Sequence, residues 1–392
     1  MFVGLVRMNR LKRLAGASLI AVSLAACQGE SLYGAKHLQP VSHDVRDKMQ
    51  SLNMSKSSPV LVRIFKEEAE LEVWRQTKGG KYALLETYEI CKWSGNLGPK
   101  FKEGDRQAPE GYYTIRPAQM NPNSSYHLSF NLGFPNAFDR AHGRTGSHLM
   151  VHGACSSRGC YAMEDDQIQD IYAMGRDAFL GGQRAFQVHA YPFRMTAKNL
   201  VAHYDSPHID FWHMLKDGYD QFDLTKIPPS VDVCGKRYVF NAKPDDPSDK
   251  FVPTEACPAY SIPRGLETAM SERQKRDNIY FQSRVAKLSA KKEKAAIAAA
   301  EAKAKAQEKE AAEIQKAALQ QQEAVDAALS TGSVQPQASG AIGKTAAASK
   351  KMLGFFTNML GNEAESKAAE FSANTAPSPV PASSLPKSKP IN

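Results

Sequence analysis

Short apolar stretches separated by turn residues dominate the chain between residues 58 and 265. Some alternate between apolar and polar positions with a period of two, and others are rich in tyrosine, valine and leucine. Both patterns predict β-strands, because successive side chains of a strand face opposite sides of a sheet. Clusters of Gly, Pro and Asn between the stretches predict turns. The predicted strands cover residues 60–65, 71–74, 82–88, 112–115, 126–130, 147–152 and 186–191.

Two stretches of the same region have helical spacing instead. Residues 164–179 place apolar side chains every three or four positions and begin with acidic residues, which favour the N-terminus of a helix. Residues 206–222 begin with Ser206-Pro207, two residue types that are typical of an N-cap and of the first helical position. Many short strands with two or three helices predict a mainly β domain, a sandwich or barrel with added helices.

A different pattern begins near residue 266. Residues 266–330 predict one long helix, because Ala, Lys and Glu dominate and residues 281–330 contain no Gly or Pro. No apolar heptad is sustained, so we expect a solvated helix or a weak partner helix rather than a strong coiled coil. At 1.5 Å per residue it would reach about 100 Å. Residues 331–392, rich in Ser, Ala and Pro, predict a disordered tail.

The beginning of the chain predicts an export signal. Basic residues precede an apolar run from Leu14 to Ala25, which is too short to span a bilayer as a helix. Cys27 follows Leu-Ala-Ala and resembles the lipidated cysteine of bacterial lipoproteins; a plain secretory leader is the alternative. We therefore expect residues 1–26 to be removed, Cys27 to carry a membrane anchor, and residues 27–57 to form a tether with a short helix. Gln28 follows this cysteine, and the absence of an Asp there resembles lipoproteins that are directed to the outer membrane, so we expect a place in the periplasm at that membrane.

The charge of the chain is concentrated at its two ends. The formal net charge is +9, but residues 1–26 contain four basic and no acidic residues, and residues 281–392 contain 15 basic and 10 acidic residues. The middle of the chain is therefore balanced. It lacks the basic surface that is typical of nucleic-acid-binding proteins, so we expect no nucleic acid partner.

Export would place five further cysteines in a compartment that permits disulfides. Because their number is odd, at least one stays free unless it pairs between chains. Cys155 could pair with Cys160 or with Cys91, whereas Cys234 and Cys257 form a disulfide or remain buried thiols.

The densest group of reactive side chains lies between residues 147 and 163. An apolar strand ends at His152-Gly153, and a short polar loop leads to Gly159-Cys160. Acyl transfer by a thiol needs a base, a cysteine and backbone N–H groups that reach an oxyanion. The glycines permit close approach of a substrate, and an imidazolium beside Cys160 would lower the pKa of its thiol.

These motifs resemble those of the YkuD-type L,D-transpeptidases, which pair a strand-borne His-Gly with a later Ser/Thr-x-Gly-Cys. Ser157-Arg158-Gly159-Cys160 matches the nucleophile motif, and His152-Gly153 matches the base motif. Further segments are similar to the family or to its YafK-like branch: residues 91–95, 109–115, 139–146, 160–163 and 192–196. The resemblance covers residues 58–265 and says nothing of the tail.

The resemblance implies an enzyme that acts on peptidoglycan stem peptides without a metal or another cofactor. Cys160 would be the nucleophile and His152 the general base, while Ser157 would orient the base or the substrate. Backbone N–H groups near Gly159 and Cys160 would stabilise the oxyanion, and Gly153 would leave room for the substrate. Attack at the L-to-D peptide bond after the diamino acid would release D-Ala and form a thioester, which an amine or water then resolves.

The sequence departs from the wider family at two points. His152 lies only eight residues before Cys160, a shorter gap than usual, and His142, 18 residues before Cys160, is a rival base. Ala162 stands where the wider family commonly has an arginine, so Arg144 or Arg158 is expected to bind the substrate carboxylate.

Other interpretations remain open. A YafK-like hydrolase that releases a protein or peptide from the murein diamino acid would use the same two residues. A non-catalytic murein-binding lipoprotein would instead recruit envelope lipoproteins or other partners through its helix and tail. Four residues on one short stretch could be zinc ligands but lack the usual two-pair spacing. They are His148, His152, Cys155 and Cys160.

Overall fold

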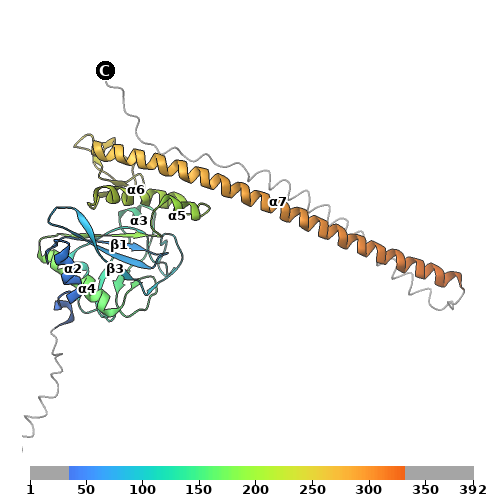
Figure 1. Ribbon diagram of the computed structural model, residues 1–392, viewed down its shortest axis with the longest axis horizontal. Coiled ribbons are helices and arrows are strands. Elements are labelled where there is room, and N and C mark those ends of the chain that lie inside the picture. The colour runs from blue at the N-terminus through green and yellow to red at the C-terminus, as the bar shows by residue number, and fades with distance from the viewer. Residues whose placement is uncertain (1–34, 332–392) are drawn as a thin grey trace, which may run out of the picture. The chain divides into compact units, whose positions relative to one another are not determined.

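The computed structural model describes residues 35–331 (Figure 1). The chain divides into two compact units, Met1–Ala286 and Lys287–Asn392. The predicted leader, the predicted lipidation site Cys27 and the predicted tail from residue 332 onward lie outside the described residues.

A five-stranded sheet forms one layer of the first unit, with the strand order β3-β2-β1-β10-β5. Its central strand β1 runs parallel to β10 and antiparallel to β2. All of β1 is buried: Val62 and Ile64 belong to the main core, and Phe65 belongs to a second core on the opposite face. Burial on both faces explains why this strand reads as an almost continuous apolar run. The strands are β1 (Val60–Phe65), β2 (Glu70–Gln76), β3 (Tyr82–Glu89), β5 (Gly111–Ile115) and β10 (Phe186–Tyr191).

A second five-stranded sheet has the order β4-β9-β8-β7-β6. Phe130, Val151 and Tyr161 from this sheet share the main core with Val62 and Ile64 of the first sheet. The two sheets therefore form a sandwich around one core. The strands are β4 (Lys92–Trp93), β6 (Met120–Asn121), β7 (Ser129–Asn131), β8 (Met150–His152) and β9 (Tyr161–Ala162).

Helices cover both faces of the first sheet. α2 (His43–Ser51) and α4 (Asp165–Leu180) lie on one side of β1, and α5 (Ala197–Ala202) and α6 (Ile209–Thr225) lie on the other (Figure 1). α6 buries Trp212 and Leu215 in the second core. The remaining elements are the 3-10 helices η2 (Lys36–Leu38) and η3 (Pro117–Gln119), helix α3 (Ala137–Ala141), and the paired strands β11 (Val231–Cys234) with β12 (Arg237–Phe240) and β13 (Lys243–Pro244) with β14 (Tyr260–Ser261).

The predicted β-rich fold with added helices is confirmed. The structure differs from the prediction mainly in the bounds of individual strands and helices and in additional short helices. The strands predicted at 126–130 and 147–152 shrink to the three-residue strands β7 and β8. α6 begins at Ile209 with His208 as its N-cap, two residues later than the predicted N-cap Ser206. α3 and α5 lie in stretches where no helix was predicted, because helices of five or six residues leave little periodicity in a sequence.

The segment predicted to be a tether belongs partly to the folded unit. The short helix expected there is present as α2, and its Val45 and Met49 are buried in the main core. Ser42 fixes the segment further, because its N–H and its hydroxyl both donate to the Asp170 carboxylate of α4, at 2.6 and 2.7 Å. The described part of this segment, residues 35–57, therefore packs against the rest of the first unit.

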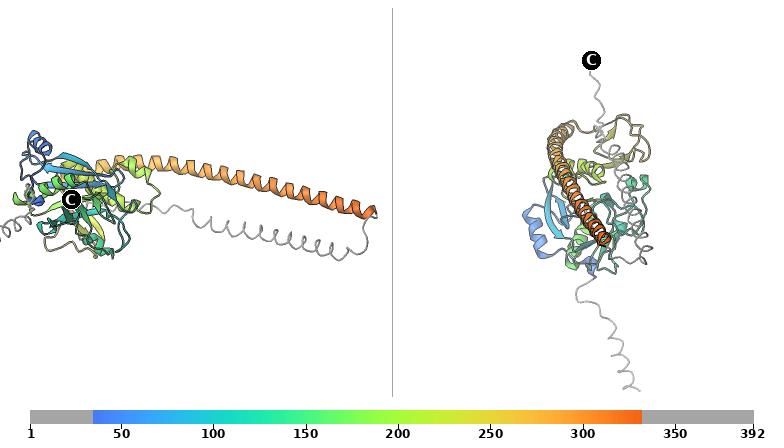
Figure 2. Two further views of the ribbon diagram at one scale, coloured as in Figure 1. Left: turned by 90° about the horizontal axis from the view of Figure 1, so that it is seen from below. Right: turned by 90° about the vertical axis from the view of Figure 1, so that its right-hand side faces the viewer.

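The predicted long helix is present as α7 (Arg264–Ser330), one continuous helix (Figure 2). Its residues up to Ala286 belong to the first unit, where Met270 is buried and Asp277 forms an ion pair with Lys216 at 2.6 Å. The described side chains from Lys287 onward are all exposed, as expected for a solvated helix. Between residues 35 and 331 no helix combines the length and the apolar content that crossing a membrane requires.

Candidate active site

The parallel pairing of β8 and β9 brings the segments of His152 and Cys160 together in the second sheet. Val151 pairs with Tyr161, and His152 pairs with Ala162. Val151 and Tyr161 are fully buried in the main core. Because side chains alternate along a strand, His152 faces the opposite side. Cys160 directly precedes β9, and the N–H of Met150 in β8 donates to its sulfur, so the thiol lies next to the strand that ends in His152.

Cys160 is the free thiol among the described residues. Cys91 pairs with Cys155 and Cys234 with Cys257, which decides between the open disulfide alternatives. The Cys160 Sγ atom accepts a hydrogen bond from Met150 N at 3.4 Å and donates to His148 O at 3.8 Å. Burial raises the pKa of the Cys160 thiol, although the Met150 N–H and the charge of Lys100 oppose the shift. The resting side chain is therefore a thiol, not the thiolate that an adjacent imidazolium would produce.

His152 is a buried, neutral imidazole. Its Nδ1 atom lies 2.6 Å from the carbonyl oxygen of Gly153, so Nδ1 carries the proton and Nε2 keeps a lone pair. Burial lowers the pKa of His152, despite the opposing hydrogen bond to Gly153. The ring also packs against Tyr126, with 4.8 Å between centroids. Such an imidazole can accept a proton at neutral pH.

Ser157 organises the turn that precedes the thiol. Its Oγ atom accepts the N–H of Gly159 at 3.3 Å and of Cys160 at 3.1 Å, and donates to Cys160 O at 2.7 Å. Ser94 in turn donates to Ser157 Oγ at 3.0 Å. Ser157 thus orients the nucleophile turn. The two N–H groups predicted to bind the oxyanion are bound to Ser157 in this structure, so their oxyanion role stays a prediction.

Gly153 and Gly159 occupy positions that disfavour a side chain. A Cβ at Gly153 would lie 2.5 Å from the Asp165 carboxylate, which accepts the N–H of Ala154 at 2.8 Å. Gly159 has a φ of 120°, a conformation that favours glycine. The lack of a side chain therefore permits the close approach of Asp165 at Gly153 and the positive φ at Gly159, on either side of the loop between base and thiol.

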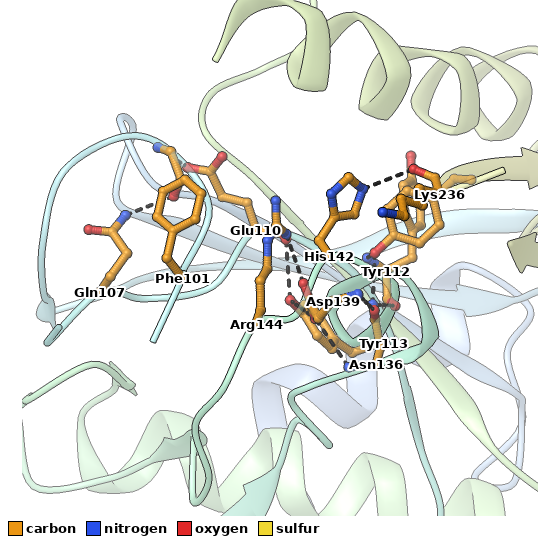
Figure 3. A network of polar contacts seen from close by, with 12 residues as sticks. Phe101, Gln107, Glu110, Tyr112, Tyr113, Asn136, Asp139, His142, Arg144 and Lys236 are labelled. Carbon is orange, nitrogen blue, oxygen red and sulfur yellow. Dashed lines mark hydrogen bonds and ion pairs between the residues drawn. The ribbon is translucent and has the colours of Figure 1, made fainter. Parts of the chain in front are cut away.

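The two predicted carboxylate-binding arginines have contrasting positions. Arg144 is 8% exposed and forms an ion pair with Asp139 at 2.8 Å (Figure 3). It also packs against three aromatic rings. Asp139 also accepts the Tyr113 hydroxyl at 3.3 Å. Arg158 is exposed on the nucleophile loop. The geometry therefore gives Arg144 a structural partner and leaves Arg158 accessible.

His142, the rival base, is engaged elsewhere. It lies at the C-cap of α3, with its Nε2 atom 2.9 Å from Lys236 O (Figure 3). Its ring packs on Phe138. The four residues considered as zinc ligands do not come together as a group within residues 35–331. One group with metal-ligand geometry occurs there, Cys91, Cys155 and Glu164, but the two cysteines are joined in a disulfide and cannot act as thiolates.

The loop from residue 96 to residue 108 contributes residues that sequence reasoning missed. Lys100 is the cation whose charge acts on Cys160, and Asp105 is its ion-pair partner. In the sequence these residues lie in a run of turn signals about 60 positions before the thiol. No local pattern links them to it, so the fold was needed to find them.

Comparison with known proteins found two matching curated relatives, and no family model matches the chain. Both are named "Putative L,D-transpeptidase YafK", one from Escherichia coli strain K12 and one from Escherichia coli O157:H7. Each is 42% identical over 249 residues, which cover 63% of this chain and 97% of the relative.

Similar solved structures include two proteins of bacterial origin. The helical cell shape determining protein Pgp2 from Campylobacter jejuni has a TM-score of 0.28 and 18% identity, over 49% of this chain and 81% of that chain. Bd1075 from Bdellovibrio bacteriovorus has a TM-score of 0.25 and 21% identity, over 36% and 51%. TM-scores this low carry no structural argument.

Proposed function

Because the chain belongs to the YafK-type L,D-transpeptidases, with 42% identity over 97% of such a relative, we propose that it is a cysteine acyltransferase acting on peptidoglycan stem peptides. The observation that carries the mechanism is the pairing of β8 with β9, which sets a free thiol at Cys160, the residue before β9, next to the strand that ends in the neutral imidazole of His152. General-base catalysis requires a base in its neutral form beside a nucleophile that still holds its proton.

In the first half-reaction, His152 Nε2 accepts the Cys160 thiol proton as the sulfur attacks the carbonyl carbon of the L-to-D peptide bond. The tetrahedral intermediate collapses with cleavage of the C–N bond. His152 then returns the proton to the leaving amine, which departs as a D-amino acid. The product is a thioester between the donor peptide and Cys160.

In the second half-reaction, an amine of an acceptor attacks the thioester carbonyl and gives up a proton to His152. Cleavage of the C–S bond restores the Cys160 thiol, which takes back that proton. The new amide is a cross-link. No metal or organic cofactor is needed for either half-reaction.

Ser157 and Arg158 support this chemistry in the proposal. Ser157 fixes the nucleophile turn through its hydrogen bonds to Gly159 and Cys160. An oxyanion that forms during the reaction would have to replace Ser157 Oγ as the acceptor of one of these N–H groups. Arg158, exposed beside the thiol, is better placed than the buried Arg144 to meet a substrate carboxylate.

Hydrolysis is the second candidate function. Cys160 is half-buried and the adjoining residues 154–156 are exposed, so water has access to a thioester at this position. Water in place of the amine would release the donor peptide, or a protein attached to it, without forming a cross-link.

Incubation of purified muropeptides with the protein, with and without an acceptor amine, tests the two candidates. New cross-linked species that depend on the acceptor support transfer. Release without cross-links supports hydrolysis. Mapping the adduct of a thiol alkylator that abolishes activity tests the nucleophile: labelling of another cysteine, with Cys160 unlabelled, would contradict the assignment.

For the whole protein we propose a lipid anchor at Cys27, a place at the periplasmic face of the outer membrane, and partners among envelope lipoproteins. The motif around Cys27 supports this proposal. Metabolic labelling with a fatty acid tests it, because a Cys27→Ala variant should lose the label.

A further inference from the structure

Ser94 lies where the segment of β4 meets the nucleophile turn. Trp93 of β4 pairs with Tyr161 of β9 in antiparallel register. Because the two strands run in opposite directions, the residue after Trp93 lies across from the residue before Tyr161. The register therefore brings Ser94 opposite Cys160.

The backbone around Ser94 is held at several points. The N–H of Ala108 donates to Ser94 O at 2.9 Å. Cys91, which directly precedes β4, is joined by a disulfide to Cys155 in the loop between base and thiol. Gly95 follows Ser94 with a φ of 92°, a conformation that favours glycine. The position of Ser94 is thus set by the fold and does not depend on its hydroxyl group.

The Ser157 hydroxyl is the partner of the Ser94 hydroxyl. Ser157 donates to the carbonyl oxygen of Cys160 at 2.7 Å, and a carbonyl oxygen can only accept. The single Ser157 proton is therefore used there, and Ser94 is the donor in the 3.0 Å contact between the two hydroxyl groups. The N–H groups of Gly159 and Cys160 also donate to Ser157 Oγ, at 3.3 and 3.1 Å.

Three donors therefore meet one oxygen atom, Ser157 Oγ, and a hydroxyl oxygen has two lone pairs. The Ser94 hydroxyl makes the shortest of the three bonds and occupies one lone pair. The N–H groups of Gly159 and Cys160 share the other, so neither of them has a lone pair of its own. A negatively charged oxygen is a stronger acceptor than a hydroxyl group, so one of these N–H groups can transfer to an oxyanion at little cost.

We propose that Ser94 is a positioning residue for the oxyanion site. Its hydroxyl group holds one lone pair of Ser157 Oγ and so keeps one N–H group of the nucleophile turn available to the oxyanion that forms when Cys160 attacks a carbonyl carbon. The inference rests on the proposed role of Cys160 and deepens it. Ser94 transfers no proton and stays bound to Ser157 throughout. Without Ser94 each N–H group would have a lone pair of its own, and its transfer to the oxyanion would break a full hydrogen bond.

Two reagents that react with Cys160 by different routes test the proposal. p-Nitrophenyl acetate acylates a thiol through a tetrahedral oxyanion: the S–C bond forms, the thiol proton goes to His152 Nε2, and the C–O bond breaks to release p-nitrophenolate. Iodoacetamide instead displaces iodide at a saturated carbon and forms no oxyanion. Both rates are measured at one pH on the full chain with its disulfides intact, by mass spectrometry of the peptide that contains Cys160.

Ser94→Ala removes the hydroxyl group and keeps the backbone contacts. We expect acylation to become about tenfold slower, as for the net loss of one hydrogen bond to a charged group, and alkylation to keep its rate. A purely structural role in the turn would slow both reactions, because both need the sulfur in its place. An equal loss in both reactions, or an unchanged rate of acylation, would overturn the proposal.

Two matched variants separate the Ser94 hydroxyl from other effects. Ser94→Thr keeps a hydroxyl group and is expected to keep most of the acylation rate. Ser156→Ala removes an exposed hydroxyl group from the nucleophile loop and is expected to leave both rates unchanged. Acylation that is as slow in Ser156→Ala as in Ser94→Ala would also overturn the proposal.

Neither reagent contains a stem peptide, so this test does not depend on the proposed substrate. Acylation at Cys160 with the expected dependence on Ser94, in a protein that leaves stem peptides unchanged, would refute the proposed function alone. Turnover of stem peptides with equal kcat/KM in the unmodified protein and in Ser94→Ala would refute the role of Ser94 alone.

Discussion

The Nδ1 atom of His152 lies 2.6 Å from the carbonyl oxygen of Gly153, which holds the imidazole proton on Nδ1 and leaves Nε2 as the basic nitrogen. Burial shifts the pKa values of the two reacting groups in opposite directions. It lowers the pKa of His152 below its ordinary 6.5 and raises the pKa of Cys160 above its ordinary 9.0. At neutral pH the pair is imidazole and thiol.

The first prediction concerns pH. We expect kcat/KM to fall as the pH drops through the lowered pKa of His152, with a midpoint below 6.5, because protonated His152 cannot accept the thiol proton. Direct alkylation of Cys160 should have its midpoint above 9.0. A pre-formed imidazolium–thiolate pair would instead give rapid alkylation well below neutral pH, and that result would contradict the general-base mechanism.

The second prediction concerns Ser157. Ser157→Ala removes the acceptor of two N–H groups and the donor to Cys160 O. We expect kcat/KM to fall by about tenfold and Tm to fall by a few degrees, as for the loss of one or two net hydrogen bonds. The exposed neighbour Ser156→Ala is the control. If both variants lose activity equally, the turn is not what orients the thiol.

The third prediction concerns the disulfide between Cys91 and Cys155, which closes a loop with a sequence separation of 64. Loop-closure entropy predicts that Cys91→Ser/Cys155→Ser lowers the free energy of unfolding by about 4 kcal/mol. Activity should fall as well, because Cys155 lies in the loop that leads to Cys160. Urea unfolding and muropeptide turnover measure the two effects.

Cys234→Ser/Cys257→Ser is the matched control for that prediction, since this disulfide spans 23 positions away from the nucleophile loop. It should destabilise the protein and leave the turnover of the remaining folded protein unchanged. An equal loss of turnover in both double variants would show that the Cys91–Cys155 disulfide has no specific role at the site.

The fourth prediction separates the two arginines. Arg144→Gln leaves Asp139 buried without its cation, which should cost about 3–5 kcal/mol of stability. Arg158→Gln should leave Tm unchanged and raise KM for substrates with a free carboxylate. The opposite pattern, a stable Arg144→Gln variant with a raised KM, would place the substrate carboxylate at Arg144.

Local patterns were sufficient to predict most of the first sheet. Val60–Phe65 and Phe186–Tyr191 are buried strands whose apolar runs are visible in the sequence. The odd number of cysteines indicated a free thiol, and the pattern around Cys160 indicated which one. These features depend on neighbouring residues alone.

Features that depend on long-range contacts were not predictable. The docking of α2 depends on Asp170, which lies 128 positions from Ser42. The close approach of Lys100 to Gly146, 46 positions later in the chain, is likewise visible only in the fold. The resting thiol also differs from the thiolate that a neighbouring imidazolium would give, because burial, which the sequence does not show, dominates the pKa of Cys160.

The most direct test of the proposed function is intact-protein mass spectrometry of the full chain during turnover of a purified stem peptide. We expect a covalent adduct with the mass of the donor peptide minus its terminal D-amino acid, mapped to Cys160 and absent from Cys160→Ala. A Cys160→Ala variant that still turns over the peptide, or an adduct on another residue, would contradict the assignment of Cys160 as the nucleophile.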